Sequence, residues 1–471
     1  MQKMIKKQLS FIKPLIFFSI ILNILLFFSC IDNMDLPSAP DTEIAPTSNK
    51  QYIEITPCWE FSDLDIDYVS DIFIAKDGRF FIADSVNNKL IVLRQSGKPA
   101  DNNYDVLKNP VIDGVNISPT ASCVDPRFIV YFVDGNDKIY AWNQFVSQTG
   151  ITGIVDSMKY TNGTDTIITT PLESLYLDEY TSIKNTEFLN NESTFLDSIT
   201  SPYIFYDPNS PKNIQVNSSY ASKTKKFIAL AQSSSDDKFI FAMDKFNNKL
   251  AKITLVPSEL ILLENGQTIW TYEGVLDDFI AEEGTGGGTI NEPTGMTSDN
   301  DGNLYYTQLG NYFGLHKLLS NSYNCVFNKD NHEIMQLDQF QNAIDVAVDN
   351  NASIFVLDSA ANLVKKFTSN GSFDKFVGVS NNWIRQPDTN ITIFPIDTTE
   401  IIDGNDTTYS IIFDTTTTIK DTLILEYKND ILNKATAIAE YEDVIYISDT
   451  GNRRILRYTL SEDVNIQDPD Q

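Results

Sequence analysis

The amino-acid sequence predicts an all-β protein, a six-bladed β-propeller with β-hairpin insertions. Three observations predict it: a strand–turn–strand unit recurs along the chain, no helical pattern lies between the copies, and a lone strand near the start can complete the last blade. Hydrophobic residues make up 42% of the chain, which is enough to form a core. A seven-bladed ring is the alternative, because residues 150–230 can contain either a divergent blade or an insertion.

The recurring unit is clearest in residues 443–460. Residues 444–447 are β-branched or aromatic, as is typical of a strand, and residues 455–460 form a second β-prone run. The turn between them, residues 450–452, contains Gly and Asn, which tolerate the positive φ of a tight reversal. Asp449 ends the first strand, so its carboxylate can accept hydrogen bonds from amides of the turn.

The same unit recurs three more times, with an aspartate at the end of the first strand of each copy. The aspartates of the four copies are Asp84, Asp244, Asp358 and Asp449. An asparagine stands three residues later in three copies, and Ala361 takes its place in the other. We expect these aspartates to have a structural role in the repeat turns. Strand pairs repeated in this way indicate a propeller or a solenoid.

These motifs resemble the NHL-repeat β-propeller family. That family's repeat has a Pro-containing lead-in, a strand ending in Asp, an Asn-rich turn, and a strand that starts with Arg or Lys followed by Ile. Residues 292–306 match the lead-in and first turn best, and the glycine-rich residues 284–289 resemble the family's inter-blade loop. The resemblance implies a propeller of the NHL type. It does not imply an activity, because fold does not dictate function.

The start of the chain has the pattern of a secretory signal: four lysines, an almost wholly apolar run over residues 15–28, and Ser29 before Cys30. The apolar run is shorter than the ~20 residues that a membrane span needs. Cys30 makes residues 1–29 resemble a bacterial lipoprotein signal peptide, which implies lipidation of Cys30, with palmitate, and a membrane anchor. An ordinary signal peptide and an uncleaved anchor stay open as alternatives.

Residues 30–50 are rich in Pro, Ser and Asp and lack periodicity, so we expect a flexible tether. Their acidic residues resemble the surface-export signals of Bacteroidetes lipoproteins. We therefore expect an outer-membrane lipoprotein of the cell envelope that faces the periplasm or the cell surface. Residues 51–465 are expected to form a single propeller with insertions near 150–230 and 385–433, and residues 466–471 a short tail.

The formal net charge of the chain is −29 at pH 7. Binding to nucleic-acid phosphates needs clusters of Lys and Arg, so the sequence excludes a nucleic-acid partner. Anionic headgroups would also repel the chain, so a lipid rather than charge should hold it at a membrane. After the signal peptide, Cys58, Cys123 and Cys325 allow at most one internal disulfide. We expect a monomer whose fold depends on its core.

Residues 51–55 alternate as a strand that can close the last blade and protect its edge. Residues 128–142 predict the hairpin of a second blade. Residues 150–230 hold no recognisable repeat, so they contain either one divergent blade or one large insertion. We favour the insertion and six blades, because the resemblance to the NHL family implies six, its commonest number. Residues 385–433 predict a meander of strands with Thr-rich turns that forms a flap on one blade.

One copy of the repeat departs from the pattern. Gln308 stands where the aspartate is expected, and the following turn carries Tyr312 and Phe313. Two aromatic residues in a turn either pack against an adjacent loop or, if exposed, form a binding patch. Tyr312 and Phe313 are therefore the candidate binding turn.

The sequence contains two histidines, His316 and His332, which cannot supply the histidine set of zinc-dependent lyases of the NHL type. No Gly-x-Ser-x-Gly nucleophile elbow occurs, and residues 284–289 lack the Lys-Ser/Thr of a phosphate loop. The sequence therefore identifies no catalytic residue, metal ligand or cofactor. Gluconolactonase-like propellers bind calcium through scattered Glu, Asn and Asp side chains, so calcium is the alternative cofactor.

These observations predict a lipid-anchored binding or scaffold propeller of the cell envelope that recognises a protein, peptide or glycan without catalysis. Loops on one face, together with the insertions, would form its recognition surface. The alternative is a calcium-dependent lactonase or hydrolase with a funnel-shaped active site. The two hypotheses differ at the mouth of the axis: converging carboxylates or amides favour the enzyme, and mixed apolar and aromatic groups favour binding.

Overall fold

The computed structural model describes residues 50–99, 106–144, 157–161, 167–171, 182–183, 201–232, 238–262, 268–310, 313–403 and 406–461. All of them from residue 51 onward belong to one compact unit. Cys30 and most of the predicted tether lie outside the described residues, as do the signal peptide and the tail.

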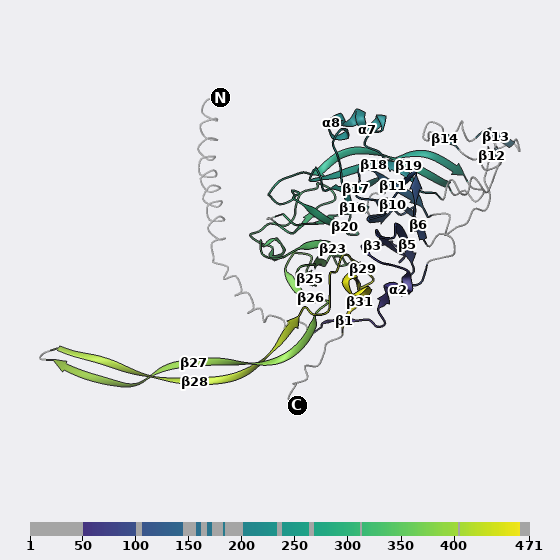
Figure 1. The fold of residues 1–471 in the computed structure, drawn as a ribbon. Helices are drawn as coiled ribbons and strands as arrows, with labels where there is room; N and C mark the ends of the chain where they lie inside the picture. The colour runs from purple at the N-terminus through teal and green to yellow at the C-terminus, as the bar shows by residue number, and fades with distance from the viewer. Residues whose placement is uncertain are drawn as a thin grey trace, which may run out of the picture. The chain divides into compact units, whose positions relative to one another are not determined.

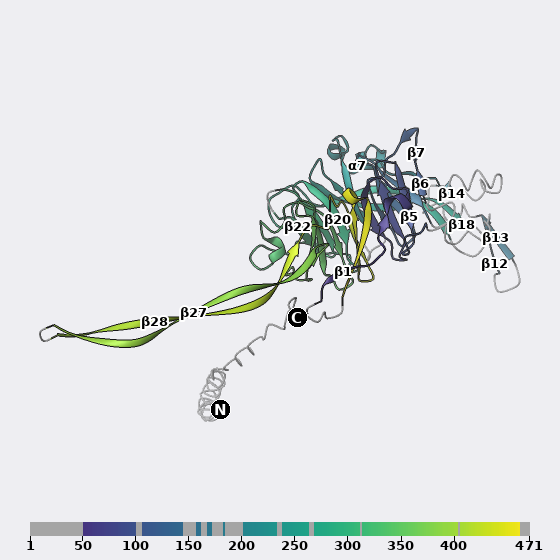
Figure 2. The same ribbon diagram turned by 60° about the horizontal axis from the view of Figure 1, so that its bottom comes forward.

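Six antiparallel sheets form the blades of a six-bladed β-propeller (Figures 1 and 2). The innermost strand of each blade contacts the innermost strands of both neighbouring blades, which closes a ring around a central axis. In ring order these strands are β3 (Val69–Ile74), β9 (Ala121–Val124), β16 (Phe227–Gln232), β20 (Pro293–Ser298), β23 (Ala343–Val348) and β29 (Ile438–Tyr441). We number the blades 1 to 6 in this order. The six-bladed prediction is confirmed, and the seven-bladed alternative is wrong.

Further strands follow outward from the axis in each blade. Blade 1 adds β4 (Phe80–Asp84), β5 (Lys89–Leu93) and β6 (Val106–Lys108), and blade 2 adds β10 (Ile129–Val133), β11 (Ile139–Asn143) and β15 (Tyr203–Tyr206). Blade 3 adds β17 (Phe239–Asp244), β18 (Lys249–Leu262) and β19 (Thr268–Ala281). Blade 4 adds β21 (Leu304–Gln308) and β22 (Leu315–Leu318), and blade 5 adds β24 (Ile354–Asp358), β25 (Leu363–Phe367) and β26 (Phe373–Val377).

Blade 6 combines strands from both ends of the described chain. Its strands β30 (Val444–Asp449) and β31 (Arg454–Leu460) come late in the sequence. The early strand β1 (Tyr52–Glu54) pairs with β31 and sets Tyr52 opposite Leu460, and β2 (Trp59–Glu60) pairs with the same strand. The expected closure by an early strand is therefore confirmed. It covers a sheet edge that an open ring would leave unpaired.

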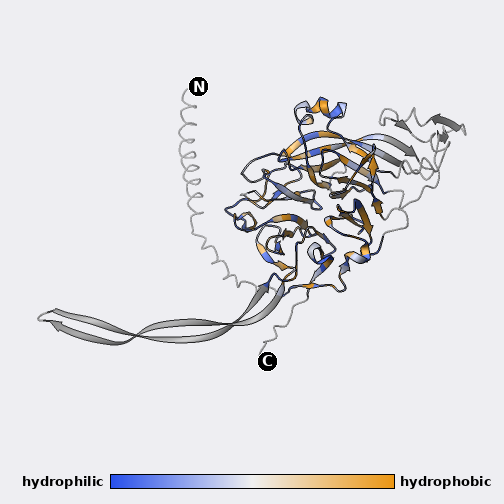
Figure 3. Cartoon of the chain, viewed as in Figure 1, coloured by the Kyte–Doolittle hydropathy of each residue, from blue (hydrophilic) through white to orange (hydrophobic). Residues whose placement is uncertain are grey.

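The blades are held together by apolar side chains that point alternately to the two faces of each strand. In β4, Phe80 and Ile82 pack toward blade 6, whereas Phe81 and Ala83 pack toward blade 2. All four side chains are 0% exposed. Burying one Phe stabilises a fold by ~1.5–3 kcal/mol, so neither face of a blade can be left to solvent. Figure 3 shows the hydrophobic residues along the strands of the blades.

The described parts of the first insertion do not form a blade of their own. They are the hairpin of β12 (Ser157–Thr161) and β13 (Ile167–Pro171), the short β14 (Ser182–Ile183), and the helices α7 (Pro211–Val216) and α8 (Ser218–Ala221). The same region supplies β15, the outer strand of blade 2. Ser210 caps α7, because its side chain accepts a hydrogen bond from Asn213 N at 3.3 Å.

The second insertion is one long hairpin of β27 (Ser380–Asp403) and β28 (Asp406–Lys428), which pair with each other along their length (Figure 1). The predicted meander is therefore wrong. The Asp-Thr-Thr runs that suggested turns lie within the strands, because the β-branched Thr continues a strand well.

The remaining elements are short. They are α2 (Phe61–Leu64), the hairpin of β7 (Val111–Ile112) and β8 (Val115–Asn116), and the 3₁₀ turns η1 (Glu333–Met335) and η2 (Thr450–Asn452). Within the described part of the chain, no helix has the length and apolar character that crossing a membrane requires.

Candidate functional site

The repeat aspartates accept hydrogen bonds from backbone amides of their own blades, and each is 0% exposed. Asp84 Oδ2 accepts a hydrogen bond from Asp67 N at 3.0 Å, and Oδ1 accepts from Tyr68 N at 3.3 Å and Asn87 N at 3.2 Å. Asn87 Nδ2 also donates to Asp84 Oδ2 at 2.9 Å. The carboxylate thereby joins the turn after β4 to the segment that enters β3.

Asp244 and Asp358 repeat this arrangement, with amide donors Lys226 and Asn247 for Asp244, and Gln341, Asn342 and Ala361 for Asp358. Asp449 accepts from Asn433 N and, in its turn, from the side-chain Nδ2 of Asn452. Asp244 also accepts from the Tyr220 hydroxyl, and Asp449 from Arg454 Nε, both at 2.8 Å. These buried carboxylates bond to the protein itself and do not line the axial cavity described below.

Gln308 takes the place of the repeat aspartate in blade 4. Its Oε1 accepts from Asn291 N at 2.9 Å, as the carboxylates do, while Nε2 donates to Phe313 O at 2.9 Å. Phe313 is half-buried, packs against a core cluster and meets the His316 ring edge-on at 6.0 Å. Phe313 thus packs within the protein, and Tyr312, its partner in the candidate binding turn, lies outside the described residues.

His316 is also a packed residue. Burial lowers the pKa of its imidazole to about 4, so the ring is neutral at pH 7. Its Nδ1 accepts from Gly288 N at 2.9 Å, and the ring stacks on Tyr306 with centroids 4.9 Å apart. Among the described residues, no group of three or more His, Cys, Asp or Glu side chains is arranged to hold a metal ion. Cys58, Cys123 and Cys325 are free thiols.

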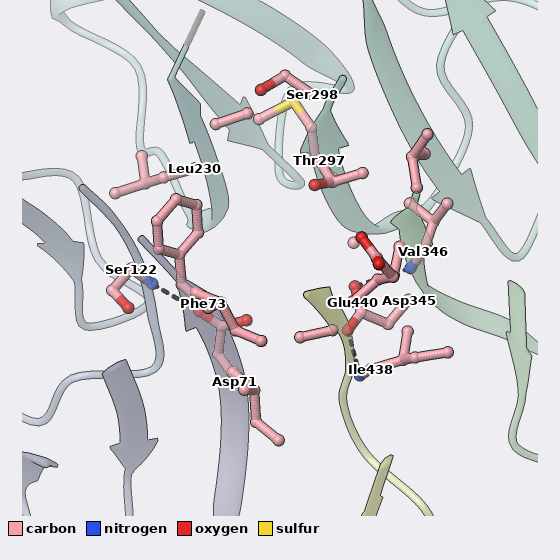
Figure 4. A pocket seen from close by; sticks show the side chains of 18 of the residues that line it. Asp71, Phe73, Ser122, Leu230, Thr297, Ser298, Asp345, Val346, Ile438 and Glu440 are labelled. Atoms are coloured by element: carbon pink, nitrogen blue, oxygen red, sulfur yellow. Dashed lines mark hydrogen bonds between the residues drawn. The ribbon is translucent and has the colours of Figure 1, made fainter. Parts of the chain in front are cut away.

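The innermost strands of all six blades line one cavity of about 510 Å³ on the axis of the ring (Figure 4). Its lining extends to the turns that join the first and second strands of the blades, with Lys76, Pro126, Asn300, Asn350 and Glu442. The cavity therefore reaches that face of the propeller. Small-molecule sites commonly have volumes of ~300–1,000 Å³. The axial cavity is the candidate functional site.

Two aspartates occupy the same position in blades 1 and 5, on either side of blade 6. Asp71 in β3 and Asp345 in β23 each follow an irregularity in the pairing of their strand with the next one. Asp71 Oδ2 accepts from Ser122 N at 2.7 Å, and Asp345 Oδ2 accepts from Ile438 N at 2.9 Å. Each carboxylate thus joins its blade to the next blade of the ring.

A third carboxylate, Glu440 of β29, lines the same cavity. Figure 4 shows Asp71 on one side of the cavity and Asp345 with Glu440 on the other. Burial raises the pKa of Asp71 to about 7, and burial with the charge of Asp71 raises the pKa of Asp345 to about 8. Burial, then the charge of Asp349, raises the pKa of Glu440 to about 7. These axial carboxylates therefore exchange protons near neutral pH.

The remaining walls of the cavity mix apolar and hydroxyl groups. Labelled examples in Figure 4 are Phe73, Leu230, Val346, Ile438, Thr297 and Ser298. The cavity therefore combines the apolar groups expected for a binding site with the carboxylates expected for an enzyme.

The axial carboxylates were missed by sequence reasoning, because a single acid within an apolar strand does not stand out. A signal for two of them was present, since Asp71 precedes Asp84, and Asp345 precedes Asp358, by the same thirteen residues. An offset shared by two blades marks a common position on the innermost strand. Glu440 has no such counterpart.

No protein-family model matches the sequence, and no curated protein matches it. Similar solved structures include virginiamycin B lyase from Staphylococcus aureus, at 11% identity and a TM-score of 0.35, covering 88% of this chain and 99% of that one. A gluconolactonase from Xanthomonas campestris has 7% identity and a TM-score of 0.41, covering 88% and 90%. An auxiliary nutrient binding protein from Bacteroides ovatus has 8% identity and a TM-score of 0.38, covering 84% and 70%. Similarity with such low identities and TM-scores assigns neither a family nor a function to this chain.

Proposed function

We propose that this chain is a non-catalytic binding propeller of the NHL type that is anchored by lipid at the cell envelope. Its binding site is the axial cavity, and its partner is a protein, peptide or glycan that places an end or a side group there. The observation that supports this proposal is the 510 Å³ cavity itself, lined by every blade with apolar, hydroxyl and carboxyl groups. A rigid ring of blades holds these groups in place without a ligand.

The repeat turns support the same proposal by elimination. The repeat aspartates, the most regular acidic feature of the sequence, are buried and bonded to amides of their own blades. Phe313 of the candidate binding turn is half-buried against the core. The axial cavity is therefore the better place for a ligand.

The test is capture of envelope components by immobilised full-length protein in detergent. Thr297→Trp fills the cavity from β20, and Val86→Trp adds the same bulk at an exposed turn of blade 1, where Val86 is 63% exposed. We expect capture by the wild type and by Val86→Trp, and at least tenfold less capture by Thr297→Trp. Equal capture by all three proteins would place the binding site elsewhere.

The anchor has its own test. We expect the wild type in the membrane fraction of a bacterial host, labelled by radioactive palmitate, and Cys30→Ser unlabelled. Two acyl chains give stable anchoring, whereas a chain this acidic has no electrostatic attraction to anionic lipids. Unlabelled wild-type protein would show that Cys30 is not lipidated.

A second candidate is a hydrolase or lactonase that uses the axial carboxylates as acid and base. The observation that favours it is that pKa values of about 7 for Glu440 and about 8 for Asp345 suit proton transfer near neutral pH. Calcium is the cofactor to add in its assay. Turnover of lactone, ester or glycoside substrates that Glu440→Gln abolishes would favour this candidate over the binding protein.

A further inference from the structure

We propose that the axial cavity binds a small organic cation, an ammonium or guanidinium group on an apolar body. This inference rests on the proposed binding function and names the chemical class of the group that enters the cavity. The cation could be a free molecule or the basic end of a peptide, and both sources present the same group to the cavity.

The first argument is the imbalance of charge. Asp71, Asp345 and Glu440 line the cavity, and none of them forms an ion pair with a base in the described part of the chain. No Lys or Arg is among the groups that shift the pKa values of these three acids. Lys76, an exposed side chain at the rim, is the one base among the described lining residues.

Other acids of the propeller differ from these three acids in this respect. Ion pairs join Asp449 to Arg454 and Asp65 to Lys89, both at 2.8 Å. Asp125, which also lines the cavity, is paired with Arg127 at 3.1 Å. The fold thus provides a base for each of these acids but none for Asp71, Asp345 or Glu440. Because a buried carboxylate without a counter-charge is unfavourable, the axial acids gain most from a cation supplied by a ligand.

The second argument is the shape and chemistry of the walls. A metal ion needs three or more converging ligands, and the described residues offer no such group. The cavity of about 510 Å³ is also far larger than a metal ion and its ligands require. Phe73 and Leu230 offer apolar surface on the side of the cavity that faces Asp345 and Glu440 in Figure 4. An aromatic face beside carboxylates suits an organic cation, because ring and acid both attract positive charge.

The third argument is a buried hydroxyl beside Asp71. Ser122 lines the cavity and is 3% exposed, and its Oγ makes no hydrogen bond of normal geometry. The hydroxyl lies near enough to Asp71 to favour the ionised carboxylate. A buried polar atom without a full hydrogen bond is unfavourable. The N–H groups of a ligand cation can donate both to Ser122 Oγ and to the Asp71 carboxylate.

The experiment compares three probes of one shape and different charge by isothermal titration calorimetry on the full chain in detergent. They are 2-phenylethylammonium, 2-phenylethanol and phenylacetate. We expect the ammonium to bind at one site, the alcohol at least tenfold more weakly, and phenylacetate not at all. Phenylacetate or the alcohol binding as tightly as the ammonium would overturn the proposal.

Variants place the binding in the cavity. Glu440→Gln keeps an acceptor for Asp443 N, which donates to Glu440 Oε1 at 2.8 Å, so this variant retains its local hydrogen bond. We expect at least a tenfold loss of affinity for the ammonium in Glu440→Gln, and the same in Asp345→Asn. Asp278→Asn removes an exposed acid from the outer strand of blade 3 and should bind as the wild type does. Unchanged affinity in both cavity variants would refute the proposal.

Further arms separate this inference from the function it rests on. One possible result is that N-acetylglucosamine binds, that Thr297→Trp blocks this binding, and that the ammonium does not bind. The binding function would then stand, and the cation would be excluded as the ligand. Stoichiometric Ca²⁺ binding that Glu440→Gln abolishes would replace the organic cation by a metal. Failure of the ammonium probe at millimolar concentration also excludes the cation, whereas the capture experiment decides the binding function independently.

Discussion

The repeat turns and the axial cavity use the same side chain for different purposes. Asp244 in a repeat turn is 0% exposed and accepts from amides of its own turn, from Lys226 N and from the Tyr220 hydroxyl. Asp345 at the axis accepts from Val346 N and Ile438 N and borders a cavity. The difference lies in the number of donors around the carboxylate. Burial with few donors favours the protonated form of Asp345.

The comparison shows how one scaffold separates stability from recognition. The repeat aspartates join the segment that enters a blade to the turn after its second strand, and they are not part of the cavity lining. Their oxygens already accept hydrogen bonds from the protein, so they offer little to a ligand. Asp71 and Asp345 join neighbouring blades, and no base within the described part of the chain balances the charge of the axial acids. We expect changes at the first set to act on folding, and changes at the second to act on binding and on pH dependence.

The largest effect is expected for Asp244→Ala. It leaves the part-buried amides of Lys226 and Asn247 and the buried Tyr220 hydroxyl without their acceptor, and each buried unsatisfied group costs ~1–3 kcal/mol. We expect the free energy of unfolding to fall by about 3 kcal/mol or more, measured by urea denaturation. Glu440→Gln, which keeps its acceptor, should change the same quantity by less than ~1 kcal/mol at pH 7. Equal losses of stability in Asp244→Ala and Glu440→Gln would contradict the proposed difference between the repeat aspartates and the axial acids.

Much of the fold could be predicted from the sequence because the repeat is local. Asp84 and Asn87 lie three residues apart and hydrogen-bond within one turn, so their spacing survives wherever the turn is needed. Closure by residues 51–55 followed from the need to cover a sheet edge. The long hairpin of β27 and β28 was misjudged, since Thr-rich runs are compatible with both a turn and a strand.

The candidate site could not be predicted in the same way, because it forms between blades. Asp345 bonds to Ile438, which lies 93 residues later, and no local pattern links the two positions. Whether an acid has a basic partner likewise cannot be predicted from the sequence, because the ring of six strands determines which side chains surround it. Gln308 was recognised as a departure from the repeat, but its second hydrogen bond to Phe313 depends on the shape of the turn.

The next effect in size tests whether an aspartate fits every repeat turn. Gln308→Asp restores the repeat residue in blade 4 but removes the amide that donates to Phe313 O at 2.9 Å. It also sets a carboxylate opposite that carbonyl. We expect a loss of ~1–3 kcal/mol in the free energy of unfolding, measured by urea denaturation. A gain in stability would show that the turn of blade 4 can accommodate an aspartate. Gln308 would then not be needed for the stability of this turn.

The pH dependence of stability should be a property of the axial acids. Their pKa values of about 7 and 8 in the fold lie above the ~4 of an unfolded Asp or Glu, so the folded state holds more protons between these values. The stability that Glu440 contributes is therefore full below pH ~4 and is lost as the pH rises through about 7. Asp349, Asp443 and Glu442 lie close enough to strengthen this effect.

The measurement is the free energy of unfolding of the wild type minus that of Glu440→Gln, from pH 4 to pH 9. We expect this difference to fall as the pH rises to about 7 and to level off above it. Its size should be on the order of 1 kcal/mol, because Glu440 is only partly buried. A difference that stays constant with pH, or rises, would mean that the carboxylate of Glu440 is ionised throughout.

The smallest effect concerns the one repeat turn that lacks its asparagine. Asn87, Asn247 and Asn452 each donate from Nδ2 to the aspartate of their turn, at 2.9, 2.7 and 2.9 Å. In blade 5 the matching position is Ala361, so Asp358 accepts no such bond. Ala361→Asn supplies the donor, and we expect a gain of ~0.5–1 kcal/mol in the free energy of unfolding.

Urea denaturation at pH 7 measures that gain, and Ala361→Ser is the matched control, because its shorter side chain does not reach as far toward Asp358. The gain has to exceed the side-chain entropy lost on ordering the amide, which limits it to a small value. A loss of stability would show that the neighbourhood of Ala361, which is 9% exposed, is too crowded for the amide. Such a result would mean that blade 5 meets the need of its buried aspartate through Lys365, whose Nζ lies 3.8 Å from Asp358 Oδ2.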